Sequence, residues 1–113
     1  MLANDNKVIC PTIECAFSLL GKRWVGLIIH VLLEEPKRFK DLTTIIPTIS
    51  QKMLADRLKE LESHGIVVRK VYPETPVKIE YELTERGKAL KPVMKEIKLW
   101  SNKYMLNSDG VED

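Results

Sequence analysis

A change of hydrophobic period near Gly65 constrains the fold of this 113-residue chain more than any other feature of the sequence. Before the glycine, Leu54, Leu58 and Leu61 recur at helical spacing and predict one apolar stripe along a helix. After it, residues 77–83 alternate strictly between apolar and polar side chains, which is typical of a half-buried strand. Glycine readily adopts the left-handed conformation with which helices end. A helix that ends near residue 65 and is followed at once by strands is therefore predicted.

The residues on either side of the predicted turn at 73–76 indicate a hairpin. Residues 66–72 are rich in β-branched and aromatic side chains, which favour strands. The turn, Pro-Glu-Thr-Pro, contains two prolines that cannot donate a backbone hydrogen bond and so cannot pair regularly. We expect two antiparallel strands with a stiff, proline-bounded tip.

Two short helices are predicted before the hairpin. Residues 40–46 form the first, which Pro47 stops, and Ser50 caps the second, because its hydroxyl can accept a hydrogen bond from an unpaired amide of the first turn. A helix, a short turn and a second helix make the helix-turn-helix unit, in which the second helix reads DNA bases and the first braces it. With the hairpin, the arrangement is a winged helix. Residues 37–39 are predicted as a short strand, with Phe39 pointing inward.

The N-terminal third predicts two further helices. Cys10-Pro11 opens a helix over residues 11–20, because proline is favoured in the first turn. Its buried side is expected to carry Ile13, Phe17 and Leu20. A strongly apolar helix over residues 22–33 is the expected core helix, and its His30 is interpreted as a packed or half-buried side chain and not as a ligand.

A last helix is predicted from Thr84 to about Tyr104, with a kink near Pro92. Its apolar residues follow a spacing of three and four, which is typical of a seam against another helix. We assign this seam to a second copy of the chain, packed together with Phe17 of the first helix; the alternative is that the helix folds back on its own core. Residues 107–113 are interpreted as a frayed acidic tail. The predicted dimer interface consists of Phe17, Val93, Ile97, Trp100 and Tyr104.

The composition of the chain restricts its possible fold and function only weakly. A hydrophobic content of 44% and a charged content of 30% are ordinary for one folded domain of this length. No apolar run is long enough to cross a bilayer and the start is too polar for a signal peptide, so a cytoplasmic protein without a membrane partner is expected. The net charge of +2 is small, but residues 22–78 hold eleven Lys or Arg against seven Asp or Glu. This central basic surplus favours a polyanion partner.

The helix that begins at Ser50 carries the residues best suited to DNA. Gln51 can make a paired hydrogen bond to adenine, and Lys52 can reach guanine or phosphate. Asp56, on the same face, would repel phosphate. Singly, each cation is more simply a solvated charge, whereas as a set they favour contact with DNA. The predicted DNA-binding residues are Arg38, Lys40, Ser50, Gln51, Lys52, Ala55, Lys59, Lys70 and Lys78. Arg57 lies nearer the leucines and is expected to pair with Glu60 or Glu62.

Cys10 lies at a helix start, where the helix dipole and unpaired amides favour the reactive thiolate. It is a candidate sensor; the alternative is a buried thiol that seals the dimer contact. Cys15 lies in the middle of the same helix and is not in a Cys-x-x-Cys pair, so a disulfide with Cys10 would be strained, and a disulfide between subunits stays open. Two cysteines and two histidines without ligand spacing predict no metal site and no cofactor. No nucleophile and base converge in the sequence pattern, so an enzyme is not predicted.

Eight short motifs follow one another along the chain: Cys10-Pro11, Leu20–Trp24, Pro36–Phe39, Ile49–Leu54, Leu58–Glu62, Val71–Glu74, Ile79–Tyr81 and Leu83–Gly87. In this order and spacing they resemble the HxlR-type winged helix-turn-helix transcriptional regulators of bacteria and archaea. The resemblance covers roughly residues 8–105 and implies a homodimer that pairs through its first and last helices and binds operator DNA. In some members the cysteine that Cys10 matches senses electrophiles or oxidants. The chain departs from the family pattern at Thr48, which replaces a glycine, and at Lys78, which replaces an arginine.

The sequence thus predicts an α+β, mainly α, fold: one winged helix-turn-helix domain over 1–113 with extra N- and C-terminal dimerisation helices. The helix-turn-helix is placed at about 40–65, the wing at about 66–83, and the dimerisation helices at about 11–20 and 84–106. The predicted function is a homodimeric, sequence-specific DNA-binding regulator on a pseudo-palindromic operator. Cys10 is its candidate sensor of electrophiles or oxidants, and the inducer is unknown. The alternative is a winged-helix module for protein contact without DNA binding.

Overall fold

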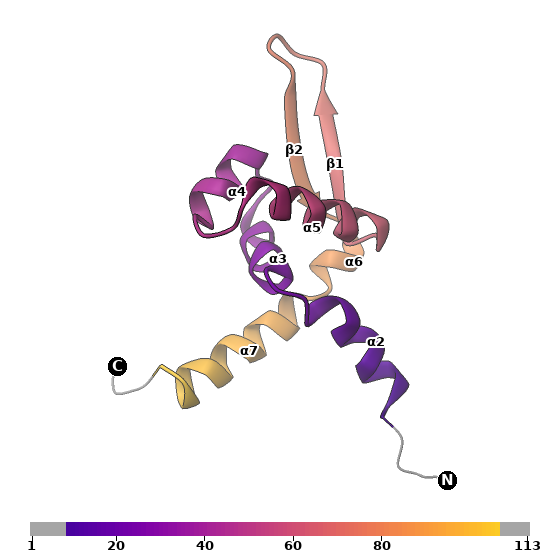
Figure 1. Cartoon of the computed structure of the whole chain (residues 1–113), viewed down its shortest axis with the longest axis vertical. Helices are drawn as coiled ribbons and strands as arrows, with labels where there is room; N and C mark the ends of the chain where they lie inside the picture. Colours follow the sequence, from indigo (N-terminus) through magenta and orange to yellow (C-terminus); the bar gives the residue numbers. More distant parts are fainter. Residues whose placement is uncertain (1–8, 107–113) are drawn as a thin grey trace.

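The computed structural model of the protein describes residues 9–106 as a mainly helical fold with one two-stranded antiparallel sheet (Figure 1). The winged helix-turn-helix order predicted from the sequence is confirmed. The elements are α2 (Pro11–Leu20), α3 (Val25–Glu34), α4 (Phe39–Ile45), α5 (Gln51–Ser63), β1 (Val67–Tyr72), β2 (Lys78–Leu83), α6 (Glu85–Lys88) and α7 (Lys91–Tyr104).

Helix α3 is the centre of the core, as predicted, but it begins three residues later than expected. Trp24 precedes it with a left-handed φ of 80°, and the amide of Val25 donates to the Lys22 carbonyl at 3.2 Å, so that residues 22–24 form a turn. His30, predicted to be packed or half-buried, is exposed. The buried hydrophobic core consists of Leu19, Val25, Ile28, Ile29, Leu32, Leu42, Ile46, Ile49, Leu54, Leu58, Leu61, Ile66, Val67 and Leu83.

Helices α4 and α5 form the helix-turn-helix around this core. The backbone amide of Arg38 donates to the Asp41 carboxylate at 2.9 Å and fixes the start of α4 at Phe39. The short strand predicted at 37–39 is reduced to a single bridge between Lys37 and Tyr81, because Phe39 already belongs to the helix. Phe39 is half-buried and packs against the core.

Helix α5 begins and ends as predicted. The Ser50 hydroxyl accepts a hydrogen bond from the Met53 amide at 3.0 Å, which satisfies one of the unpaired donors of the first turn. Gly65, with φ of 71°, takes the left-handed conformation just after the helix and lets the chain turn directly into β1.

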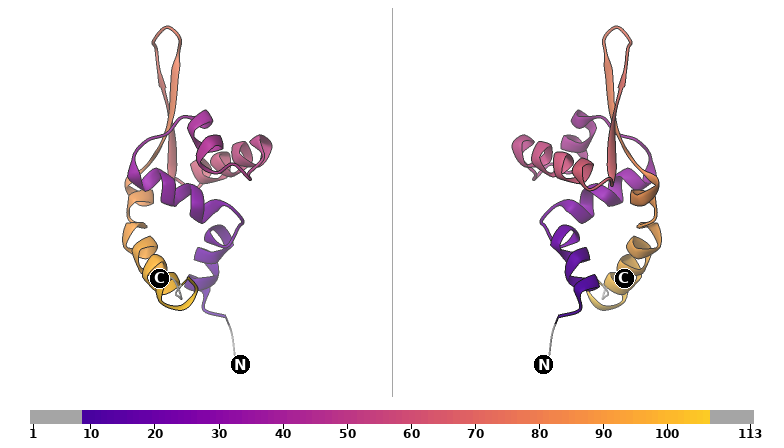
Figure 2. Two further views of the ribbon diagram at one scale, coloured as in Figure 1. Left: turned by 90° about the vertical axis from the view of Figure 1, so that its left-hand side faces the viewer. Right: turned by 90° about the vertical axis from the view of Figure 1, so that its right-hand side faces the viewer.

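The hairpin pairs β1 with β2 in antiparallel register, from Val67 opposite Leu83 to Tyr72 opposite Lys78. Val67 and Leu83 are buried, so the base of the hairpin belongs to the core. From that base the hairpin projects away from the helices, with the turn at residues 73–77 as its tip (Figures 1 and 2).

The single last helix predicted from Thr84 is wrong: it is two helices, α6 and α7. The Thr84 hydroxyl caps α6 by accepting from the Gly87 amide at 3.2 Å. The ring of Pro92 would clash with the carbonyl of Lys88 in a continuous helix, so a turn at residues 89–90 intervenes. Pro92 then occupies the first turn of α7, where it is well tolerated.

Helices α2 and α7 extend from the end of the molecule opposite the hairpin (Figures 1 and 2). Of the buried side predicted for α2, Leu20 is partly buried against the core of the chain, whereas Ile13 and Phe17 are more than half exposed; Leu19 is the buried residue of the helix. Along residues 9–106 no single helix has the length and apolarity to cross a membrane. Helices α2 and α3 have that length and apolarity only when taken together, and they are bent by 78° relative to each other.

Candidate DNA-reading surface, dimer seam and thiol site

Helix α5 holds its polar face outward by burying its leucines. Leu54, Leu58 and Leu61 are at most 1% exposed, whereas Gln51 and Lys52 in the first turn are exposed. Lys59 is exposed farther along the helix, and Ala55 is half-buried beside the first turn. The helix therefore offers side chains with both donor and acceptor groups from its N-terminal half, the part that enters a major groove in helix-turn-helix proteins.

The remaining predicted cations flank α5 on two sides. Arg38 and Lys40 are exposed at the start of α4, the bracing helix. Lys70 and Lys78 lie on the hairpin, which rises beside α5 (Figure 1). The fold thus brings the three groups of predicted DNA-binding residues to the half of the molecule that lies away from α2 and α7.

Ion pairs within the chain involve three of these lysines, a feature that the sequence alone did not reveal. Lys52 lies 3.0 Å from Asp56, Lys70 lies 3.2 Å from Glu82, and Lys78 lies 3.5 Å from Glu80, measured between nitrogen and carboxylate oxygen. The predicted basic surface is therefore an alternation of positive and negative charge.

Arg69 is a hairpin cation that sequence reasoning passed over. It is exposed, and no ion pair involves it within residues 9–106. Its strand position, between Val68 and Lys70, puts it on the opposite face from Lys70, so the two-residue period of β1 was the signal that could have identified it.

A second group of charged residues links α5 to the turn before α3 through ion pairs and a hydrogen bond. Glu60 pairs with Lys22 and, at 3.4 Å, with Arg57, as predicted for Arg57. Arg57 also donates to the Arg23 carbonyl at 3.0 Å. The hydrogen bond from Lys22, together with the nearby positive charges, holds the pKa of Glu60 below its usual value despite some desolvation. Arg57 is therefore a structural residue in this arrangement.

An apolar surface runs along α2 and α7. No residue of α7 is buried, and Trp100 and Tyr104 are 57% and 64% exposed, with ring centroids 5.9 Å apart. Phe17 of α2 is 62% exposed. Between α2, α3 and α7 lies an apolar cavity of about 420 Å³, whose lining includes Phe17, Leu20, Trp24, Leu27, Val93 and Ile97.

Cys10 is the N-cap of α2, and its thiol is fully exposed. Backbone hydrogen bonds from Ile13 and then Thr12 hold the pKa of the Cys10 thiol below its usual value, because the amides at the helix start stabilise the thiolate. Cys15 is also a free, exposed thiol, and it lines a separate cavity of about 270 Å³ together with His64 and Arg86. Both cysteines lie on α2, and neither is in a disulfide.

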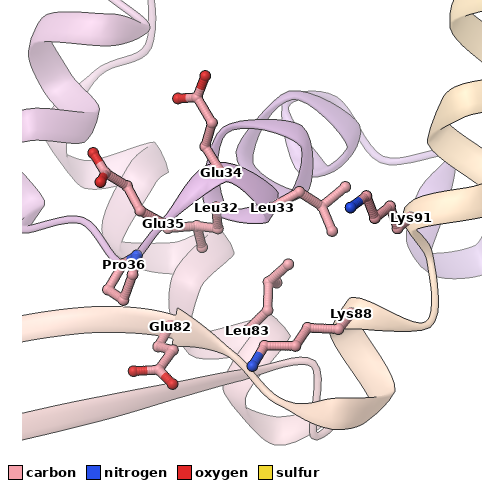
Figure 3. A pocket seen from close by; sticks show the side chains of 9 residues that line it. All are labelled: Leu32, Leu33, Glu34, Glu35, Pro36, Glu82, Leu83, Lys88 and Lys91. Carbon is pink, nitrogen blue, oxygen red and sulfur yellow. The ribbon is translucent and has the colours of Figure 1, made fainter.

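A further cavity, of about 290 Å³, lies between the end of α3, the base of β2 and α6 (Figure 3). The lining combines leucines with charged residues, and in Figure 3 the carboxylates of Glu34 and Glu35 point away from the leucines. The lining includes Leu32, Leu33, Leu83, Glu34, Glu35, Glu82, Lys88 and Lys91. Its lining contains neither histidine nor cysteine. Across residues 9–106, no three His, Cys, Asp or Glu side chains are placed to hold a metal ion.

Comparison with known proteins identifies a family and several relatives that the chain resembles. The model of the HxlR-like helix-turn-helix family matches residues 19–109. The HTH-type transcriptional regulator YodB of Bacillus subtilis is 60% identical over 103 residues, covering 91% of this chain and 92% of YodB. The reduced form of YodB superposes with a TM-score of 0.79, covering 90% of this chain and all of the solved one.

Two more solved structures are similar. Quinone-bound YodB from B. subtilis is 57% identical with a TM-score of 0.73, covering 84% of this chain and all of that one. The oxidised form of the redox regulator HypR is 39% identical with a TM-score of 0.79, covering 89% and 100%. Together with the winged fold and the outward face of α5, these matches show that the chain is a transcriptional regulator that belongs to the HxlR-like helix-turn-helix family.

Proposed function

We propose that this cytoplasmic, single-domain regulator is a homodimer that binds a pseudo-palindromic DNA operator through α5 and the hairpin. Cys10 releases or alters that binding when it reacts with an electrophile or oxidant. The observation that carries the proposal is the outward, polar first half of α5, anchored by three buried leucines beside a projecting hairpin.

The exposed apolar surface of α2 and α7 supports a second copy of the chain as partner. Large apolar side chains that stay in water are costly, and a contiguous set on two helices is typical of a protein interface. Phe17, Ile97 and Trp100 are each more than half exposed within one chain. A twofold dimer would set the two α5 helices about 34 Å apart, one duplex turn, so that each enters a successive major groove.

The thiol step follows from the position of Cys10 at a helix start. The thiolate adds to an electron-poor ring carbon of a quinone and forms a carbon–sulfur bond. One ring oxygen takes a proton from water, and the hydrogen of the attacked carbon then moves as a proton to the other ring oxygen, which gives a hydroquinone thioether. The relative YodB has been solved with a quinone bound and after diamide treatment, which supports this class of reactant. An adduct on Cys10 would lie at the N-terminal end of α2, the helix whose Phe17 belongs to the proposed dimer contact.

A gel-shift series in rising salt tests DNA binding, with duplexes from the promoter next to the gene. Affinity should fall steeply with salt as fewer counterions are released. Gln51→Ala should change the preference among sequences, because Gln51 is placed for base contact, whereas Lys59→Gln should weaken all duplexes about equally. Binding that ignores salt, or no binding to any duplex, would leave a module for protein contact as the better assignment.

The thiol is tested by operator release with benzoquinone or diamide. Wild-type protein should release the operator and Cys10→Ser protein should not, with Cys15→Ser as the matched control that retains release. Equal release from the Cys10→Ser variant would remove Cys10 from the proposal and leave DNA binding untouched.

A further inference from the structure

Carboxylates on the proposed DNA-facing surface are placed beside its lysines. Asp56 lies one helical turn after Lys52 on α5, and their side chains are 48% and 86% exposed. On the hairpin, Lys70 pairs with Glu82 and Lys78 pairs with Glu80. Each of these four side chains is less than half exposed.

The hairpin pairs lie on one face of the sheet. Lys70 stands opposite Glu80, and Lys78 stands opposite Tyr72, so the alternation of strand side chains puts all of them on the same side. The Lys70 ammonium group reaches the diagonal Glu82, and the Lys78 ammonium group lies 5.1 Å from the centre of the Tyr72 ring as well as near Glu80. Each lysine thus has neighbours of opposite charge or negative potential.

Other cations of the same half of the molecule have no such partner. Lys40 and Lys59 are exposed, and no ion pair involves them within the described part of the chain; the same holds for Arg69, on the other face of the hairpin. The surface therefore combines cations that are free to meet a phosphate with cations that must first leave a carboxylate.

We propose that Asp56, Glu80 and Glu82 set the sequence specificity of this regulator by competing with DNA phosphates for Lys52, Lys78 and Lys70. The inference rests on the proposed DNA-binding function. Sequence-independent affinity comes almost entirely from the release of counterions by cations that neutralise phosphates. A lysine that already has a carboxylate neighbour contributes less to this release, so binding to any duplex is weak unless base contacts add to it.

The hairpin pair Lys70–Glu82 gives the sharpest test, because a non-specific duplex of random sequence serves as the probe. Fluorescence anisotropy measures its affinity for the full chain over about 50–200 mM salt. Glu82→Gln should bind about two to five times more tightly than wild type, the range that a partly exposed ion pair spans. Its plot of log affinity against log salt should steepen by about 0.9, the contribution of one more phosphate contact.

Glu96→Gln is the control of equal charge change, because Glu96 is exposed on α7, at the end of the molecule opposite the hairpin. It should leave affinity and salt slope close to those of wild type. Lys70→Gln completes a double-mutant cycle: its loss of affinity should be small in the wild type and larger in the Glu82→Gln background, since only there is the lysine released.

The outcomes separate this inference from the function on which it rests. If wild type binds the duplex and Glu82→Gln gains no more than Glu96→Gln, the competition does not exist and only the inference is overturned. If no variant binds any duplex at low salt, both are overturned. Should Glu82→Gln fail to fold by circular dichroism, Asp56→Asn on the exposed face of α5 tests the same competition, with the same expected gain and the same refuting result.

Discussion

Gly87→Ala is the substitution whose effect the structure predicts most directly. Gly87 is buried in α6, and a Cβ there would lie 2.4 Å from the Ile66 carbonyl oxygen and 2.9 Å from Leu83 Cδ2. Contacts this short between a methyl group and a backbone oxygen do not occur, so the backbone itself must move. The same carbonyl accepts a hydrogen bond from the Thr84 amide at 3.0 Å, which the movement would weaken.

The size of the effect follows from three contributions. Overpacking in a well-packed site costs about 1–3 kcal/mol, and a weakened backbone hydrogen bond costs about 1 kcal/mol. Alanine returns up to about 1 kcal/mol through its better helix propensity. The net expectation is a loss of about 2 kcal/mol, which would move a urea midpoint down by about 1 M for a domain of this size.

Gly26→Ala is the matched control. Gly26 lies in α3, and a Cβ there would meet no heavy atom within 4 Å. The same change of residue should therefore leave the urea midpoint unchanged or raise it, through a helix-propensity gain of about 0.5–1 kcal/mol. Both variants are compared with wild type at one protein concentration, because the stability of the proposed dimer would depend on it.

A Gly87→Ala midpoint equal to or above that of wild type, with Gly26→Ala behaving as expected, would refute the close packing of α6 against the end of α5 and the hairpin base. If both variants were destabilised to the same extent, the loss of stability in Gly87→Ala would have a cause other than the contact with Ile66.

Three shorter predictions follow. The lowered pKa of Glu60 means that its carboxylate stabilises the fold above its unfolded pKa and loses that contribution as pH falls through the folded value. The gap in unfolding midpoint between wild type and Glu60→Gln should therefore be full at neutral pH, begin to narrow near the unfolded glutamate pKa of about 4.3, and close once the pH lies below the folded pKa; a gap that stays constant into acid contradicts it. In a Cys15→Ser background, the pH midpoint of Cys10 alkylation by iodoacetamide should be lower in native than in urea-unfolded protein, and equal midpoints would count against the amide contacts. Cys10 and Cys15 are separated by about 7.5 Å of helical rise, beyond the span of a disulfide at about 7 Å, so diamide should give covalent dimers on a non-reducing gel, whereas a peptide bridged within one chain would contradict this.

Local chemistry made part of this fold predictable. The Ser50 cap, the left-handed Gly65 and the antiparallel hairpin depend on neighbours close in sequence, and each was confirmed. The left-handed turn at Trp24 was missed, because nothing in the residue type marks it. The break between α6 and α7 was underestimated as a kink at Pro92, although the proline mechanism was the right one.

The sequence predicted which residues belong to the candidate site, but it did not predict which of their charges pair with one another. The positions of Gln51 and Lys52 follow from the helical period of α5. The pairing of Lys22 with Glu60 joins residues 38 positions apart, and Lys70 with Glu82 depends on hairpin register and side-chain reach. The exposure of Ile13 was missed for a related reason: an apolar period predicts burial without saying in which chain the burial occurs.

The break at residues 89–90 changes how the two ends of the molecule are connected. Arg86 donates to the His64 carbonyl at 3.0 Å, and the Thr84 hydroxyl donates to the Gly65 carbonyl at 2.5 Å, so α6 is fastened to the C-terminal end of α5. Helix α7, by contrast, has no fully buried residue, and of its side chains Met94 packs partly buried against the core of its own chain. The direction of α7 relative to α5 is therefore set through this four-residue helix and its hydrogen bonds more than through core packing. In a dimer joined along α7, the separation of the two reading helices would depend on the same few bonds.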